Sequence, residues 1–442
     1  MFSPLDERGA INEPYVYEYI LAHKLATLAV AIALAWLASA AAGRPRAALR
    51  SMAFNYGPSF ACAFFVVGVF YGGQVSSFDL AAGFLFELSV LLAYCRLFCD
   101  ALQLAASADS RSVDRWLRSS FVLQLLLALP LLTSEGFGIF SEGSRIAYLD
   151  TGGAAKYFTY AAVLLAPVQA GLLAQRLSGG RSPGLIGYCI VVATFAISTL
   201  AGSKGGFFLW AAAVLALVDY RQVRIRWIPV MAGIAAASGA LVVTANVVSD
   251  TLGITPLEFA ELALSRFFLN NDARALAFDF GGGSGQFSEL LSASFRSVAN
   301  LFGLGSIDPP LGLVLYERYF GVATGDGPNA SLIALVTYYS MRGYAMVPAF
   351  VACLGLAAVY AGVVALRGLV HGPVRKMAIT VMGLTLVQQW SQDFLAFPLL
   401  FPLACAAGML FIATDRRYAG ARLRTTPLPT RLAAPEHRHS GA

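Results

Sequence analysis

The sequence has little charge. Only 13% of its 442 residues are Asp, Glu, Lys or Arg, whereas 58% are hydrophobic. Soluble domains carry roughly 25% charged residues. The composition therefore argues against an ordinary water-soluble domain and for a membrane protein.

The chain also lacks the short motifs of several enzyme classes. It contains no Walker motif, no metal-binding His pair and no nucleophile elbow. No Asp-x-Asp pair is present in the segment expected to face outward, where such a pair could hold a divalent metal on a diphosphate. The six cysteines lie in apolar runs or at their ends, which indicates packing rather than a disulfide framework. We expect neither a metal nor another cofactor.

Apolar stretches recur along almost the whole length, and many approach the ~20 residues that a helix needs to cross a bilayer. Hydropathy indicates about eleven such stretches: 22–42, 52–71, 78–96, 118–133, 157–175, 184–202, 206–219, 228–248, 343–366, 377–393 and 396–413. The sequence therefore predicts an all-α, polytopic membrane protein with about eleven transmembrane helices.

The positive charges are segregated, and this predicts the topology. With the spans above, 21 of the 31 Lys and Arg fall on one side, and cytoplasmic loops collect such residues. The N-terminus is then external and the C-terminus cytoplasmic. The chain divides into N-terminal helices (1–248), a large external loop (249–327), C-terminal helices (328–413) and a basic, disordered cytoplasmic tail (414–442).

One lysine, Lys204, lies in the polar break 202–206 between two apolar runs, on the predicted external side. Glycines permit a tight turn there, and N–H groups at the start of the next helix favour an anion, so Ser203, Lys204 and Gly205 could contact a negatively charged ligand. A lysine that binds lipid headgroups at a short turn is an equal alternative.

Two arginines of the large loop, Arg266 and Arg274, are eight residues apart and would share one side of a continuous helix. A helix is predicted over 256–269, after Thr255 and a proline. Arginine forks suit diphosphate oxygens. The alternative is pairing with acids of the same loop, namely Glu261, Asp272 or Asp279.

The segment 329–366 is too long for one span, so we expect a short helix on the outer side followed by a full span. Arg342 would then line a cavity near the outer surface. Two acids, Glu87 and Asp393, fall at membrane depth. Each could be a proton-relay group in a transporter or the structural partner of an interior arginine.

This combination resembles the O-antigen polymerase family, the oligosaccharide repeat-unit polymerases. The resemblance covers most of the chain as architecture, but its local matches are short. Residues 203–205 are similar to the family's Ser-Arg-Gly element, with Lys204 in place of Arg. Residues 327–331 and 342–344 are similar to its Pro-Asn and Gly-Tyr elements, and Arg274 with Gly285 has an Arg-x10-Gly spacing. Ligases of the same superfamily are expected to use an external His; only His23 could serve, which favours a polymerase.

The resemblance implies a GT-C-like membrane glycosyltransferase at the periplasmic face of a bacterial inner membrane. It would polymerise polyprenyl-diphosphate-linked oligosaccharide units into O-antigen or another surface polysaccharide. Membrane lipids, a chain-length regulator and a flippase would be its partners, and no nucleic acid is expected. An O-antigen ligase and a lipid-linked glycan flippase or transporter are the alternatives.

The chemistry needs cations at the leaving diphosphate and a carboxylate as general base. The expected diphosphate-binding residues are Lys204, Arg266, Arg274 and Arg342. The expected catalytic residues are Arg266 and Arg274, with Asp272 or Asp279 as the base. The expected substrate-lining residues are Ser203, Gly205 and Asn329.

Overall fold

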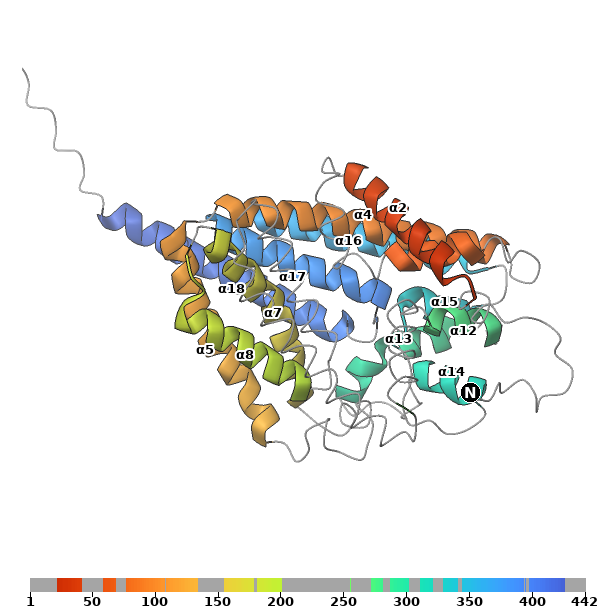
Figure 1. Ribbon diagram of the computed structural model, residues 1–442. Coiled ribbons are helices and arrows are strands. Elements are labelled where there is room, and N and C mark those ends of the chain that lie inside the picture. Colours follow the sequence, from red (N-terminus) through yellow and green to blue (C-terminus); the bar gives the residue numbers. More distant parts are fainter. Residues whose placement is uncertain are drawn as a thin grey trace, which may run out of the picture.

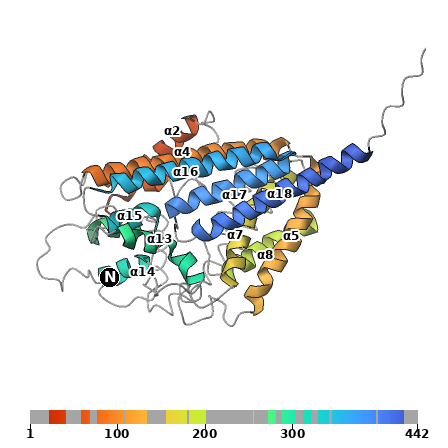
Figure 2. The same ribbon diagram turned by 180° about the vertical axis from the view of Figure 1, so that it is seen from behind.

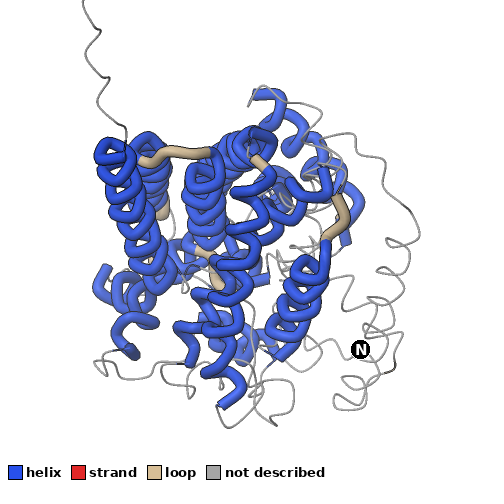
Figure 3. The backbone as a smooth tube through the Cα atoms, turned by 90° about the vertical axis from the view of Figure 1, so that its left-hand side faces the viewer, coloured by secondary structure: helices blue, strands red, loops and turns tan. Residues whose placement is uncertain are grey.

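The computed structural model describes residues 22–41, 59–68, 77–107, 109–133, 155–178, 181–200, 255, 272–280, 287–301, 311–320, 329–340, 344–392, 394 and 397–425. These residues are almost entirely helical, and no strand occurs among them (Figure 3). The predicted all-α class is confirmed.

The long helices follow predicted apolar segments. In the first half the helices are α2 (Lys24–Ala41), α4 (Ser77–Ser107), α5 (Ser110–Thr133), α7 (Ala155–Ser178) and α8 (Gly184–Leu200), with a further helical run over 59–68. The second half contains α12 (Asp272–Phe280), α13 (Phe287–Leu301), α14 (Leu311–Phe320), α15 (Leu332–Tyr339), α16 (Met346–Leu369), α17 (Pro373–Gln392) and α18 (Phe397–Thr425). Of these, α12, α13 and α14 lie in the predicted external loop. The predicted spans 206–219 and 228–248 and the predicted helix 256–269 lie outside the described residues.

The long helices form a bundle with α17 at its centre. Helix α17 packs against α4, α16, α7 and α18 (Figures 1 and 2). Two glycines allow α16 and α17 to approach closely. A Cβ atom on Gly383 would lie 2.5 Å from Val363, and one on Gly355 would lie 2.8 Å from the Trp390 ring. Small residues at helix contacts are a usual device for close packing inside membranes.

The short helices α12 to α15 gather at one end of this bundle, where α4 begins and α17 ends (Figures 1 and 2). Helix α15 begins after Ser331, whose side chain accepts a hydrogen bond of 3.2 Å from the Ala334 N–H, an N-cap contact. The longer α16 follows it. The short helix and the full-length helix that the sequence predicts for 329–366 are therefore both present.

The opposite end of the bundle holds the α4–α5 and α16–α17 connections and the end of α7 (Figure 1). Ion pairs link the helices there. Asp100 on α4 accepts from Arg367 on α16 at 2.5 Å, and Asp114 on α5 contacts Arg176 on α7. Basic segments that the sequence assigns to one side thus lie together in space.

Within the described residues, two helical stretches are long and apolar enough to cross a membrane, Phe78–Ala101 and Met346–Leu369. Four shorter apolar stretches accompany them, at Leu25–Ala38, Ser59–Gly68, Gly184–Thr194 and Leu400–Thr414. Length and composition alone make this weak support for membrane insertion, and the arrangement with about eleven spans stays a prediction.

The close contact at Gly383 gives a first prediction. Gly383→Ala adds a methyl group that meets Val363, and overpacking of this kind costs about 1–3 kcal/mol. We expect a lowered midpoint of thermal unfolding for the protein in detergent. The matched control is Gly362→Ala on α16, where an added Cβ has no neighbour within 4 Å. It should leave the midpoint unchanged or raise it, because Ala favours helix over Gly. Equal midpoints for both variants would contradict the packing.

Candidate functional site

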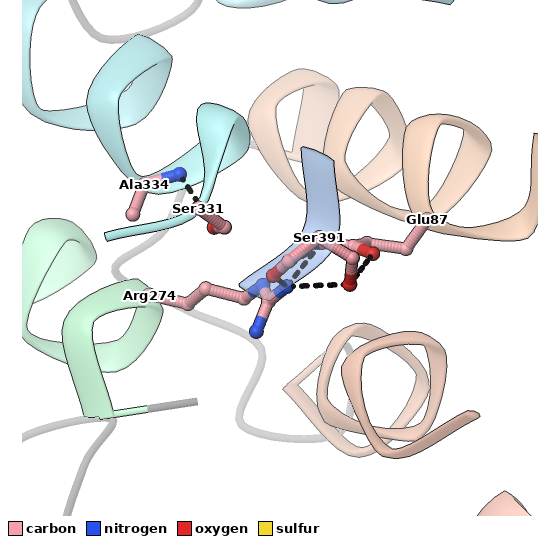
Figure 4. Close-up of polar contacts among 5 residues, drawn as sticks. All are labelled: Glu87, Arg274, Ser331, Ala334 and Ser391. Carbon is pink, nitrogen blue, oxygen red and sulfur yellow. Dashed lines mark hydrogen bonds and ion pairs between the residues drawn. The ribbon is translucent and has the colours of Figure 1, made fainter. Parts of the chain in front are cut away.

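The site begins with one arginine on a short helix. Most residues of helix α12 are buried, from Ala273 to Phe278. Its Arg274 points away from α12 toward the end of α17 and the middle of α4 (Figure 4). The arginine side chain is 3% exposed. A charged group in such surroundings needs a partner, because an uncompensated buried charge costs several kcal/mol.

Its partner is Glu87 on α4, which is fully buried at 0% exposure. Arg274 donates from Nε to Glu87 Oε1 over 2.9 Å and from Nη2 to the same oxygen over 2.6 Å. Ser391 near the end of α17 completes the group. Its hydroxyl donates to Glu87 Oε2 over 2.7 Å and accepts from Arg274 Nη2 over 2.9 Å. Arg274 Nη2 also contacts the main-chain oxygen of Ser391.

These three residues come from distant parts of the chain. Glu87 and Arg274 are separated by 187 positions, and Glu87 and Ser391 by 304. The contacts therefore fasten α12, which belongs to the predicted external loop, to one helix of each half of the bundle. We call Glu87, Arg274 and Ser391 the buried triad. Both oxygens of the Glu87 carboxylate accept hydrogen bonds, and the opposite charges of Glu87 and Arg274 cancel within the triad.

Aromatic residues next to two triad residues in the sequence pack against one another. Trp390, next to Ser391, stacks on Phe86, next to Glu87, with ring centroids 6.3 Å apart. The rings of Phe394 and Phe397 meet Trp390 edge to face at 5.6 and 5.1 Å. The Arg274 and Glu87 side chains are 3% and 0% exposed, and exclusion of water strengthens the charge interaction.

The structure shows the interior arginine that one of the two predicted roles of Glu87 requires. The contacts of Glu87 are those of a structural partner for an interior arginine. The predicted alternatives for Arg274 were acids of the same loop, and the observed partner is instead a distant one on α4. Sequence reasoning also missed Ser391, which lies in the polar segment 388–393 without a local signal for its role.

One more predicted element lies beside the triad. Helix α15 packs against α12, and the main-chain oxygen of Ala330, just before α15, accepts from the Phe394 N–H over 3.0 Å. Asn329, expected to line a substrate site, is exposed just before this contact. The Pro-Asn segment and Arg274 are therefore brought to the same end of the bundle.

The remaining predicted site residues are only partly covered. Asp279 is half-buried near the end of α12, and Asp272 opens that helix, its side chain lying outside the described part. Six residues of predicted interest lie outside the described residues altogether: Ser203, Lys204, Gly205, Arg266, Arg342 and Asp393. Within the described part of the chain, no group of three His, Cys, Asp or Glu side chains could hold a metal ion.

Comparison of the chain with protein-family models, with curated proteins and with solved structures gives no match. The resemblance to polysaccharide polymerases therefore stays an expectation based on short motifs and architecture.

The triad predicts a specific pattern of stabilities. Glu87→Leu or Arg274→Met alone leaves one buried charge without its partner, which costs about 3–5 kcal/mol. The double variant removes both charges and replaces them with apolar groups of similar size, so it should be close to wild type. Unfolding midpoints of the three variants in detergent would test this double-mutant cycle.

Arg96→Gln is the matched control. Arg96 lies 3.9 Å from Asp100 in an exposed pair on α4, and exposed pairs contribute at most about 1 kcal/mol. If the unfolding midpoint of the double variant falls by the sum of the decreases in the two single variants, the pairing of Glu87 with Arg274 is refuted.

Proposed function

We propose that the chain is a multi-pass protein of a bacterial inner membrane. The low charge and the recurring apolar segments support this. So does the outer face of α16, where Val347, Phe350, Val351 and Leu354 form an exposed stripe. A water-soluble protein rarely leaves such a continuous apolar surface uncovered. The gathering of basic connections at one end of the bundle fits a cytoplasmic end there.

We propose further that the protein is a glycosyltransferase that extends a glycan on a polyprenyl diphosphate at the external face. The observation that carries this proposal is the burial of Arg274 on α12 against Glu87 and Ser391 of the bundle. A helix of the predicted external loop is anchored in the bundle at the same end as the Pro-Asn segment around Asn329. The end of the bundle opposite the basic connections therefore has a fixed framework on which a substrate site could be built.

In this proposal the cations divide into two groups. Arg274 is already bound by Glu87 and Ser391, so its contacts favour a positioning role rather than the direct diphosphate binding expected from sequence. Lys204, Arg266 and Arg342 would then bind the diphosphate. Asp279, half-buried on the same helix as Arg274, and Asp272 are the carboxylates that α12 would offer as general base.

The reaction follows from these roles. An acceptor hydroxyl oxygen forms a bond to the anomeric carbon of the growing glycan, while the bond from that carbon to the diphosphate oxygen breaks. The diphosphate leaves with the electron pair, and the cations stabilise its developing charge. The hydroxyl proton passes to the carboxylate base.

A transporter or flippase is the second candidate, and the buried triad is the observation that favours it. An ionisable pair deep among apolar helices can mark a substrate or ion pathway. An O-antigen ligase is the third, and His23, exposed just before α2, would be its external histidine.

Deleting the gene and separating the surface polysaccharide on a gel distinguishes these functions. Loss of a polymerase should leave the lipid core carrying a single repeat unit. A ligase deletion would instead give bare core with lipid-linked polymer. An intact ladder would rule out all roles in making this polysaccharide and favour an unrelated transporter.

Substitutions at Lys204 test the proposed diphosphate contact. Lys204→Ala should abolish chain extension because the leaving group loses a cation, whereas Lys204→Arg should keep much of it. Extension is read from ladder length in the deletion strain, with protein levels matched by immunoblot. An equal loss in both variants would argue against a simple cation contact.

A further inference from the structure

Helix α5 carries a stripe of exposed side chains that changes character halfway. Its members are spaced alternately by four and three residues, which places them on one side of a helix. They are Arg111, Arg115, Arg118, Val122, Leu125 and Leu129. All six are exposed: the first three are cations and the last three are apolar, with exposures of 56%, 47% and 53% for Val122, Leu125 and Leu129.

The acids nearest this stripe are engaged elsewhere. Asp114 could pair with Arg118 one turn further on, but its Oδ1 contacts Arg176 and its Oδ2 contacts Arg181 at 3.4 Å. Asp109 precedes α5 and accepts from the Ser112 N–H over 3.0 Å. Hydrogen bonds from Ser112 hold the pKa of Asp109 below its ordinary value. Asp109 therefore stays ionised as the cap of α5.

The three arginines are thus left as an excess of positive charge. None of Arg111, Arg115 and Arg118 forms an ion pair with an acid among the described residues. The opposite face of the same helix, with Val113 and Leu117, is buried in the core. Trp116 packs edge to face on Phe411 of α18, with ring centroids 5.5 Å apart. The cationic side of α5 is therefore held facing outward by packing on the other side.

We propose that this stripe is a binding surface for an anionic phospholipid. The lipid phosphate would lie against Arg115 and Arg118, with Arg111 on the aqueous side, and an acyl chain would follow Val122, Leu125 and Leu129. The complementarity is both electrostatic and apolar. Basic residues next to a span bind anionic headgroups, and the apolar continuation suits a hydrocarbon chain. The change between Arg118 and Val122 marks the level at which headgroups meet hydrocarbon.

This inference rests on the proposed membrane insertion but not on glycosyl transfer. The headgroup would be on the side where the α4–α5 and α16–α17 connections lie, the proposed cytoplasmic side (Figure 1). It is thus separate from the buried triad and from the proposed substrate site at the other end of the bundle.

The experiment uses the full-length protein in nanodiscs that contain phosphatidylcholine and phosphatidylglycerol in equal amounts. The protein is extracted mildly, and the retained lipids are quantified by mass spectrometry. Wild-type protein should retain phosphatidylglycerol in excess. A variant with Arg111→Gln, Arg115→Gln and Arg118→Gln should lose that excess. At low salt, each substitution should lower the affinity for phosphatidylglycerol by about fivefold.

Two controls keep the outcome clear. Replacing the same three residues by Lys preserves their charge and should keep most of the excess. Replacing Arg424 at the end of α18 and Arg431 and Arg438 beyond it by Gln makes the same change in net charge elsewhere and should leave the excess intact. Equal loss in the tail variant and the α5 variant would overturn the proposal, because the attraction would then depend on overall charge.

Thermal unfolding shows whether the α5 variant is folded. In phosphatidylcholine alone, the Gln variant should unfold at the wild-type midpoint. Adding phosphatidylglycerol should raise the midpoint of wild type but not that of the Gln variant, since a ligand stabilises the state it binds. A rise of equal size in both would also overturn the proposal.

Discussion

The ion pair between Arg274 and Glu87 is the interaction on which the arrangement of this protein depends. Two opposite charges are removed from water and held among apolar helices, at 3% and 0% exposure. Their attraction and the hydrogen bonds of Ser391 must offset the cost of that removal. The pair is formed only if α12, α4 and α17 are placed correctly, so it specifies their mutual position.

This constraint joins parts of the chain that have little else in common. Helices α4, α16 and α17 are long, and α16 and α17 pack through small residues, whereas α12 to α15 are short and gather at one end. The triad and the bond from Phe394 to Ala330 attach the short helices to the long ones. The other end of the bundle is held by different means, the ion pairs of Asp100 and Asp114 with arginines of neighbouring helices. One end of the bundle is thus held by a buried ion pair, and the other end by ion pairs that are more exposed.

Much of the fold could be predicted from sequence, because apolar runs of about 20 residues have the length of a membrane-spanning helix and are too long for a strand. The division of 329–366 into α15 and α16 followed from length alone. The partner of Arg274 could not be predicted, since a contact across 187 positions leaves no local pattern in one sequence. The same is true of Ser391, whose polar neighbours gave no reason to single it out. Lys204, Arg266 and Arg342 lie outside the described residues, so their proposed roles rest on sequence.

The central claim is that the charge of Glu87 holds α12 on the bundle. Hydrogen–deuterium exchange over residues 272–280 measures this most directly, in wild type and in Glu87→Leu, with α5 as an internal reference. Opening of a helix exposes its amides to exchange. The account predicts faster exchange of α12 in the variant and an unchanged rate in α5. Equal protection of α12 in both proteins would contradict it.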